Sequence, residues 1–145
     1  CSSLTSIVIP DSVTSIGERA FSDCKSLTSM VVAEGNTVYD SREQCNAIIH
    51  TATNTLIRGC QNTIIPDGVT SIGSSAFRYC SSLTSIVIPD SVTSIGEWAF
   101  SDCSSLTSIT FNGTKAQWKG INLGYAWKND VPTKVIHCTD GEVEI

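Results

Sequence analysis

Charge is the scarcest property of this 145-residue chain. Charged residues make up 16% of it, and nine basic against fourteen acidic residues leave a formal net charge of −5. Proteins bind nucleic acids and anionic membranes through clusters of Lys and Arg, so this balance argues against both kinds of partner. The chain also has no stretch of about 18 consecutive apolar residues, and we therefore expect no insertion into a membrane.

Motifs of the common enzyme classes are absent as well. The sequence has no GxSxG, HExxH, Walker or dinucleotide-binding glycine pattern, and its histidines are His50 and His137. Each histidine lies in a strand-like run, where a half-exposed surface residue is the simplest interpretation. His137 adjoins Cys138, but neighbours in a strand point to opposite faces and do not form a nucleophile–base pair. We expect no catalytic residue and no cofactor.

A metal site has little support. The seven cysteines include no CxxC pair, which structural zinc sites use. Asp11, Asp67 and Asp90 recur after a proline and could stack as calcium-binding carboxylates. The coil that contains residues 24–45 has Ala33-Glu34 at the corresponding position, so the carboxylates would not form a continuous row. The preference of aspartate for turns explains these residues instead. We expect no metal.

The start of the chain carries no recognisable leader. It begins Cys1-Ser2-Ser3, without an initiator Met, a charged segment or the apolar segment of a signal peptide. We therefore expect a piece of a longer protein, with any signal or anchor outside this fragment.

Hydroxyl groups and β-branched side chains are abundant instead. The chain contains 21 Ser and 16 Thr, and Ile (16) and Val (11) outnumber Leu (6). β-Branched residues favour strands over helices, and a hydrophobic content of 41% is enough for a core. Because 145 residues are too few for two domains of ordinary size, the composition predicts one mainly β domain.

An internal repeat is the strongest signal. Residues 1–24 read CSSLTSIVIPDSVTSIGERAFSDC, and residues 80–103 read the same except that Trp98 replaces the equivalent Arg19. A weaker copy lies at 65–80, and the working consensus is LxxIxIPxxVxxIGxxAFxxC. A fixed period of this kind is typical of a solenoid.

The first half of each copy predicts a short strand. Leu4, Ile7 and Ile9 occupy inward positions, and Val8 between them points outward. Pro10-Asp11-Ser12 then turns the chain. One 23-residue unit cannot bury its apolar face alone, but stacked units can, by pairing each strand in parallel with the next.

The second half of each copy completes the coil. Val13 and Ile16 anchor a second short extended piece, and Gly17 allows a bend that other residues resist. We expect Glu18–Cys24 to make one helical turn, with Phe21 as its bulky core residue.

The consensus resembles the repeat of BspA-like leucine-rich-repeat proteins, which occur on the surfaces of host-associated anaerobic bacteria and some parasitic protists. The resemblance extends beyond the repeats. Residues 35–41, 45–49 and 55–60 are similar to the longer coil of these proteins, and 113–118 with 136–141 to their C-terminal closing segment.

The resemblance implies a right-handed leucine-rich-repeat-like stack that is displayed on a cell surface or secreted. It implies binding to extracellular host or neighbouring-cell proteins, and no catalysis. Ser12, Gly68 and Ser91 stand where the more familiar leucine-rich repeat has Asn, so we do not expect a regular horseshoe with an Asn ladder.

The repeats divide one solenoid domain, 1–145, into coils. We expect a coil at 1–23, a long coil at 24–79 with a hairpin insertion at about 45–60, a coil at 80–102, and a last coil with a C-terminal cap at 103–145. The runs 46–51 and 55–60 predict the two hairpin strands.

The C-terminal segment predicts a cap. Thr114 and Gln117 fit a capping box for a short helix that contains Trp118. A terminal coil has no neighbour for its last apolar face. We expect Trp118, Tyr125 and Trp127 to cover that face.

The cysteines fall into two groups. Four occupy one repeat position and predict a ladder of small buried hydrophobic side chains, namely Cys1, Cys24, Cys80 and Cys103. Cys45 and Cys60 either fill the core or form a disulfide, which becomes possible if Ile48 faces Ile57 in the hairpin.

Two sets of residues are candidates for a binding site. The first varies between copies while the scaffold stays fixed, and comprises Arg19, Arg78, Tyr79 and Trp98. The second is the outward strand face, a flat and weakly polar sheet that comprises Ser6, Val8, Ser29, Val31, Ser85, Val87, Ser108 and Thr110. Exposed Trp, Tyr and Arg are common interface anchors, although neutral drift among duplicated units explains the variation as well. A non-enzymatic adhesion-type module and a passive spacer both remain open.

Overall fold

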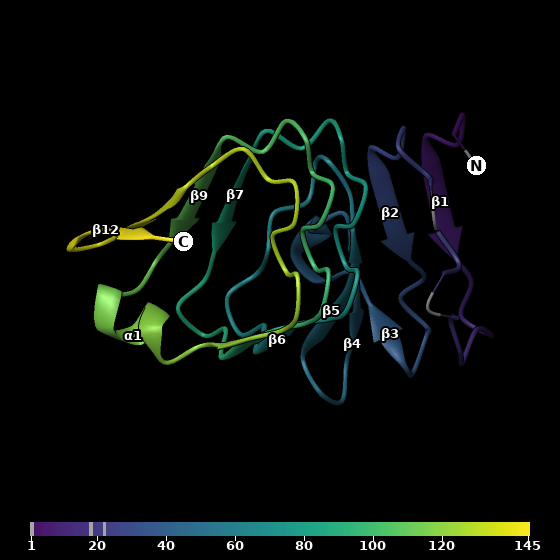
Figure 1. The fold of residues 1–145 in the computed structure, drawn as a ribbon. Coiled ribbons are helices and arrows are strands. Elements are labelled where there is room, and N and C mark those ends of the chain that lie inside the picture. Colours follow the sequence, from purple (N-terminus) through teal and green to yellow (C-terminus); the bar gives the residue numbers. More distant parts are fainter. Residues whose placement is uncertain (1, 18, 22) are drawn as a thin grey trace.

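The computed structural model of the chain describes residues 2–17, 19–21 and 23–145. Its backbone winds in stacked coils from β1 at one end to α1 and β12 at the other (Figure 1). The elements are β1 (Ser6–Ile9), β2 (Ser29–Val32), β3 (Tyr39–Asp40), the 3-10 helix η1 (Arg42–Gln44), β4 (Ala47–His50), β5 (Thr55–Gly59), β6 (Ser71–Ile72), β7 (Ser85–Ile88), β8 (Ser94–Ile95), β9 (Ser108–Phe111), α1 (Lys115–Lys119), β10 (Asn122–Leu123), β11 (Val135–Cys138) and β12 (Gly141–Glu144).

The strands of successive copies pair in parallel at the repeat period. Ser6 of β1 lies opposite Ser29 of β2, and Ser85 of β7 opposite Ser108 of β9. Both offsets equal the 23-residue spacing between copies. Since β1 with β2 and β7 with β9 repeat the same register, the predicted mainly β solenoid is confirmed.

The second extended pieces of the later copies form another sheet. Ser94 of β8 pairs in parallel with Ser71 of β6 and with Asn122 of β10. The sheet continues through the hairpin in the order β10-β8-β6-β5-β4-β3. Ile72 and Ile95 point from it into the core, as the consensus predicted for their position.

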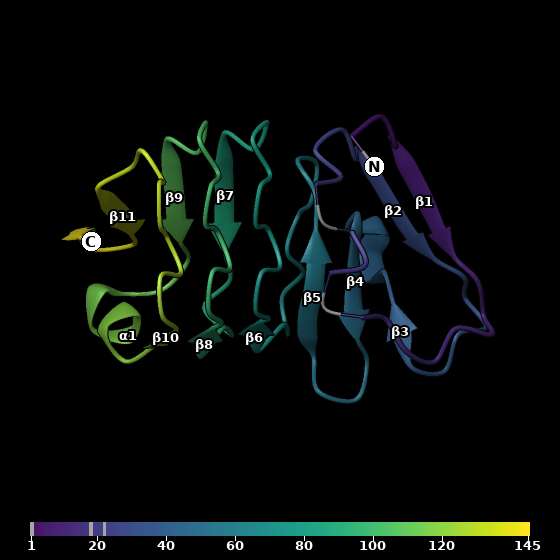
Figure 2. The ribbon, with the colours of Figure 1, turned by 45° about the vertical axis from the view of Figure 1, so that its right-hand side comes forward.

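The hairpin formed by β4 and β5 separates two hydrophobic cores. It lies between the β1–β2 coils and the β7–β9 coils (Figure 2). Ile49 and Leu56 pack into the larger core, whereas Ile48 packs into the smaller N-terminal core. The hairpin therefore shields apolar side chains on both of its faces. Its Arg58 also joins the two parts, because Nη2 donates to the Phe21 carbonyl at 3.1 Å and Nη1 to the Ser75 carbonyl at 2.8 Å.

The register of this hairpin does not meet the condition for a disulfide between Cys45 and Cys60. Ile48 lies opposite Arg58, not Ile57, and a bulge follows before Ile49. As a result Cys60 lies near Asn46, to whose carbonyl its thiol donates at 3.3 Å. Cys45 belongs to the larger core and Cys60 to the smaller one, and both are free thiols. The disulfide alternative is wrong, and both cysteines are core fillers.

Aromatic rings fill the larger core and its cap. Phe77 and Phe100 stack with their centroids 5.0 Å apart. The ring centroid of Trp127 lies 6.3 Å from that of Phe100 and 5.7 Å from that of Trp118. Both tryptophans are buried. The expected cap is present at these residues, but Tyr125 is 74% exposed and covers no apolar face. The Thr114 capping box of α1 forms as expected.

The segments that precede Cys80 and Cys103 are not helical, contrary to our expectation. At 74–79 and 97–102 it forms consecutive turns, such as the bond from the Ala76 N–H to the Gly73 carbonyl (3.2 Å). Ser75 and Trp98 have positive φ values of 59° and 54°, and left-handed residues of this kind interrupt a helix. In the first copy, Glu18 and Ser22 lie outside the described residues.

Candidate protein-binding surfaces

Exposed aliphatic side chains recur at one outward position of the coils. Val8, Val31 and Val87 are 64%, 43% and 49% exposed, and Ile64 is 77% exposed. Each of the four lies directly before the last inward-facing residue of its copy, as Val8 does before Ile9. We had not included Ile64, although it lies 23 residues before Val87 and could have been found from that spacing. These four residues are called the strip below.

The outward residues of the strands lie on two separate sheets, not on the single flat sheet that we expected. One sheet carries Ser6, Val8, Ser29 and Val31, and the other carries Ser85, Val87, Ser108 and Thr110. Ser6 and Ser85 are exposed, whereas Ser29, Ser108 and Thr110 are half-buried. The two sheets are separated at residues 61–67, which form no strand.

Thr63 explains why residues 61–67 do not join the sheet. Its hydroxyl donates to the Asn46 carbonyl at 2.6 Å and accepts from the Cys60 N–H at 2.8 Å. The Ile64 N–H also donates to the Cys45 carbonyl at 3.0 Å. Equivalent positions in other copies hold apolar residues such as Ile86. The polar side chain thus ties this segment to the base of the hairpin.

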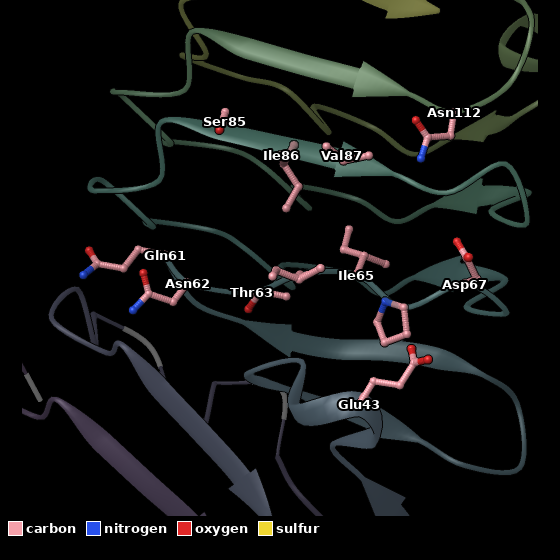
Figure 3. Close-up of a pocket in the computed structure, with 12 residues that line it drawn as sticks. Glu43, Gln61, Asn62, Thr63, Ile65, Asp67, Ser85, Ile86, Val87 and Asn112 are labelled. Atoms are coloured by element: carbon pink, nitrogen blue, oxygen red, sulfur yellow. The ribbon is translucent and has the colours of Figure 1, made fainter. Parts of the chain in front are cut away.

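A groove of about 590 Å³ lies between residues 61–67 and β7 (Figure 3). Gln61 and Asn62 lie at one end of it, and the carboxylates of Glu43 and Asp67 lie at the other. The apolar side chains between the ends include Ile65 and Ile86. We call this feature the β7 groove.

A cluster of cationic and aromatic side chains forms a second surface. The Arg78 guanidinium carbon lies 4.8 Å from the Tyr79 ring centroid and 5.1 Å from that of Trp98. Trp98 meets Tyr125 edge-on, with centroids 6.1 Å apart. Arg78 Nε also lies 3.6 Å from a carboxylate oxygen of Asp102. We call these five residues the Arg78 cluster.

The structure thus brings together three of the four variable residues that we singled out. Arg78, Tyr79 and Trp98 are half-buried in one cluster, and Arg19 is exposed in the first coil and takes no part in these stacking contacts. Sequence reasoning assigned Tyr125 to the cap and missed its contact with Trp98, because Tyr125 lies outside the repeat consensus. Its exposure gives the cluster a ring that is open to solvent.

The cysteine ladder is structural. Cys24, Cys80 and Cys103 are buried, while Cys1 lies outside the described residues. The Cys103 thiol donates to the Phe77 carbonyl at 3.0 Å. Burial raises the pKa of Cys80 to about 11 and that of Cys103 further. Thiols held neutral in this way are poor nucleophiles and poor metal ligands.

The histidines lie in ordinary surface contacts. His50 meets the Tyr39 ring edge-on at 5.8 Å, and His137 Nδ1 lies 3.3 Å from a Glu142 carboxylate oxygen. Within residues 2–17, 19–21 and 23–145, no group of three or more His, Cys, Asp or Glu side chains is arranged to hold a metal ion. None of these residues belongs to a helix with the length and apolarity of a membrane span.

The chain is similar to solved structures of bacterial proteins. The chain is 24% identical to a leucine-rich cell surface protein from Faecalibacterium prausnitzii A2-165, with a TM-score of 0.55, covering 82% of this chain and 51% of that one. A leucine-rich repeat protein from Eubacterium ventriosum ATCC 27560 is 23% identical, with a TM-score of 0.52, covering 74% and 36%. The pneumococcal vaccine antigen PcpA is 17% identical, with a TM-score of 0.59, covering 94% and 45%.

The chain spans about half or less of each of these structures. No curated protein matches it. Six copies of the BspA type leucine-rich repeat region match residues 1–45 and 55–119, which is more than half of the sequence. The chain therefore belongs to the BspA-type leucine-rich repeat family.

Proposed function

We propose that this chain is a non-enzymatic protein-binding module of a bacterial cell-surface or secreted protein. The family and the solenoid fold support this function. Among the structural neighbours, one is described as a cell surface protein and another as a vaccine antigen. Its partners are extracellular proteins of a host or of neighbouring cells.

The strip is the observation that carries the proposal. The neighbouring outward position holds Ser in three of these four copies, yet Val8, Val31, Ile64 and Val87 place aliphatic side chains at one repeat position. Single exposed apolar residues are common, but these four recur at one repeat position, with Val8 and Val31 side by side on the β1–β2 sheet and Ile64 and Val87 lining the β7 groove. Exposed apolar surface of this kind marks interaction sites. Burying such area against a partner contributes about 25 cal/mol per Å².

The Arg78 cluster supplies anchors for the same function. Trp, Tyr and Arg are enriched among residues that dominate binding energies, and the cluster contains all three types. Arg19 offers a further exposed cation at the position equivalent to Trp98. The outward serines and Thr110 add hydroxyl groups beside the strip.

A passive spacer is the alternative function. A stacked solenoid can hold another domain away from a cell wall without binding anything. The exposed strip favours the binding module, because a spacer gains nothing from aliphatic side chains on its surface.

The test is binding of extracellular matrix and plasma proteins to the immobilised chain, measured by surface plasmon resonance. A triple variant, Val8→Ser with Val31→Ser and Val87→Ser, should lose at least tenfold in affinity for a partner found this way. The control replaces exposed threonines outside the strip, Thr14→Ser with Thr93→Ser and Thr107→Ser, and should bind normally. Unchanged affinity of the triple variant contradicts the proposal, and absence of any partner favours the spacer.

A further inference from the structure

β7 presents an unpaired edge to the β7 groove. It is the terminal strand of its sheet, in the order β12-β11-β9-β7. Its Ile88 carbonyl accepts from the Asn112 N–H at 2.9 Å, on the side of β9. In a parallel ladder alternate residues bond to the same neighbour, so the backbone groups of Ser85 and Val87 face the groove. Among the described residues, no backbone hydrogen bond joins β7 to 61–67.

The groove has a distinct chemistry along its length. Between an amide end and an acidic end, the apolar side chains of Ile65 and Ile86 come from opposite sides (Figure 3). The acidic end carries Glu43 and Asp67, and the residues that line the groove include no Lys or Arg. A ligand with a positive charge at this end and an aliphatic group at the centre is complementary to both features.

An extended peptide complements the groove better than a compact ligand, because it can hydrogen-bond to the unpaired backbone groups along β7. Unpaired strand edges are templates for pairing with another chain, and extended segments add to them through main-chain hydrogen bonds. The solenoid leaves this edge open because Thr63 ties the neighbouring segment to the hairpin base. The strands of successive repeat copies pair in parallel, as β1 does with β2 and β7 with β9. A segment added to the free edge of β7 is therefore expected to run in the same direction.

We propose that the β7 groove binds an extended segment of a partner protein, parallel to β7, with a Lys or Arg at its C-terminal end. The segment hydrogen-bonds to the backbone of Ser85 and Val87, and its basic side chain lies beside Glu43 and Asp67. This inference rests on the proposed protein-binding function and names the chemistry of the partner.

The test uses two fluorescein-labelled peptides and fluorescence anisotropy. The probe, Thr-Ser-Ile-Val-Ile-Lys-Lys, copies the sequence of residues 84–88 and adds two lysines, and its counterpart ends in Glu-Glu. We expect the lysine peptide to bind at least tenfold more tightly than the glutamate peptide. The preference should disappear in the double variant Glu43→Gln with Asp67→Asn.

The chain offers a matched control. Asp11 and Asp90 follow the proline of their copies as Asp67 does, and neither lines the groove. The double variant Asp11→Asn with Asp90→Asn removes the same charge and should keep the tenfold preference. Equal affinity for both peptides, no binding of either, or an equal loss in this control overturns the groove assignment. If the peptides fail while a protein partner still binds through the strip, the proposed function stands without the groove.

Discussion

One sequence is packed in two ways in this molecule. Residues 4–16 and 83–95 are identical, yet Val13 and Ile16 are half-buried in the first copy while Val92 and Ile95 are fully buried in the second. The second extended piece of the second copy, β8, pairs with β6 on one side and β10 on the other, whereas residues 13–16 of the first copy form no strand. Burial in a solenoid is therefore a property of the neighbours as much as of the coil's own sequence.

Two equivalent glycines, one in each copy, show the same difference in packing. A Cβ on Gly96 would lie 2.5 Å from the Ser74 backbone nitrogen, because the coils stack closely there. At the equivalent Gly17, no described atom lies within 4 Å of such a Cβ. Gly96 makes this contact with the preceding coil, and among the described residues no coil precedes that of Gly17, so the first copy lacks the neighbour that packs the second.

The largest difference should come from the core phenylalanines. Phe100→Ala should lower the free energy of unfolding by about 3–5 kcal/mol, because it leaves a cavity beneath fully packed neighbours. Phe21→Ala should cost clearly less, since that ring is already 9% exposed. Urea unfolding of both variants gives the two values, and equal losses would contradict the packing difference.

The glycine pair should give the next largest difference. Gly96→Ala should destabilise the chain by about 1–3 kcal/mol, because backbone must move to admit the methyl group. Gly17→Ala should stay within about 0.5 kcal/mol of the parent. Thermal unfolding followed by circular dichroism compares them, and a Gly17→Ala loss as large as that of Gly96→Ala would show that the first coil is stacked as tightly.

The ladder thiols should differ in reactivity. Burial raises the pKa of Cys103 strongly, so little thiolate forms at pH values near 8 and alkylation of the native protein should be very slow. Cys24 closes the equivalent first copy in the smaller core and is 7% exposed against 0% for Cys103, so it should react faster. Brief iodoacetamide labelling and mass spectrometry measure both sites. Prompt labelling of Cys103 would reject the buried ladder.

The smallest stability effect is expected at Trp98. Trp98→Ser should leave stability within about ±0.5 kcal/mol, because Ser75 occupies the equivalent left-handed position in the preceding copy. If the Arg78 cluster anchors a partner, the same change should weaken binding by more than about 1 kcal/mol. Calorimetry of unfolding and of partner binding separates the two effects, and unfolding of the variant would assign Trp98 to packing.

The repeat was enough to predict the stacked architecture. Its period determines the strand register, and its apolar spacing predicts inward residues such as Leu83 and Ile86, both of which are buried. The strip was visible in the same spacing. Local patterns of this kind are reliable because every copy repeats the same contacts with the next.

Features that depend on non-repeated contacts could not be predicted in this way. The bulge at Ile48 shifts the hairpin register and separates Cys45 from Cys60. The β7 groove depends on a hydrogen bond between Thr63 and Asn46, although the polar residue at an apolar repeat position was a usable signal. Tyr125 reaches Trp98 through the fold of the cap, which no repeat describes.

Hydrogen exchange at individual amides tests the central claim most directly. Residues 4–16 and 83–95 have the same sequence, so their intrinsic exchange rates are nearly equal and differences in protection report on packing and local opening. NMR resolves the two copies residue by residue. We expect the amides of Ile86 and Ile88 to exchange at least 100-fold more slowly than those of Ile7 and Ile9. Equal protection of the two copies would contradict the conclusion that neighbouring coils determine the stability of each repeat.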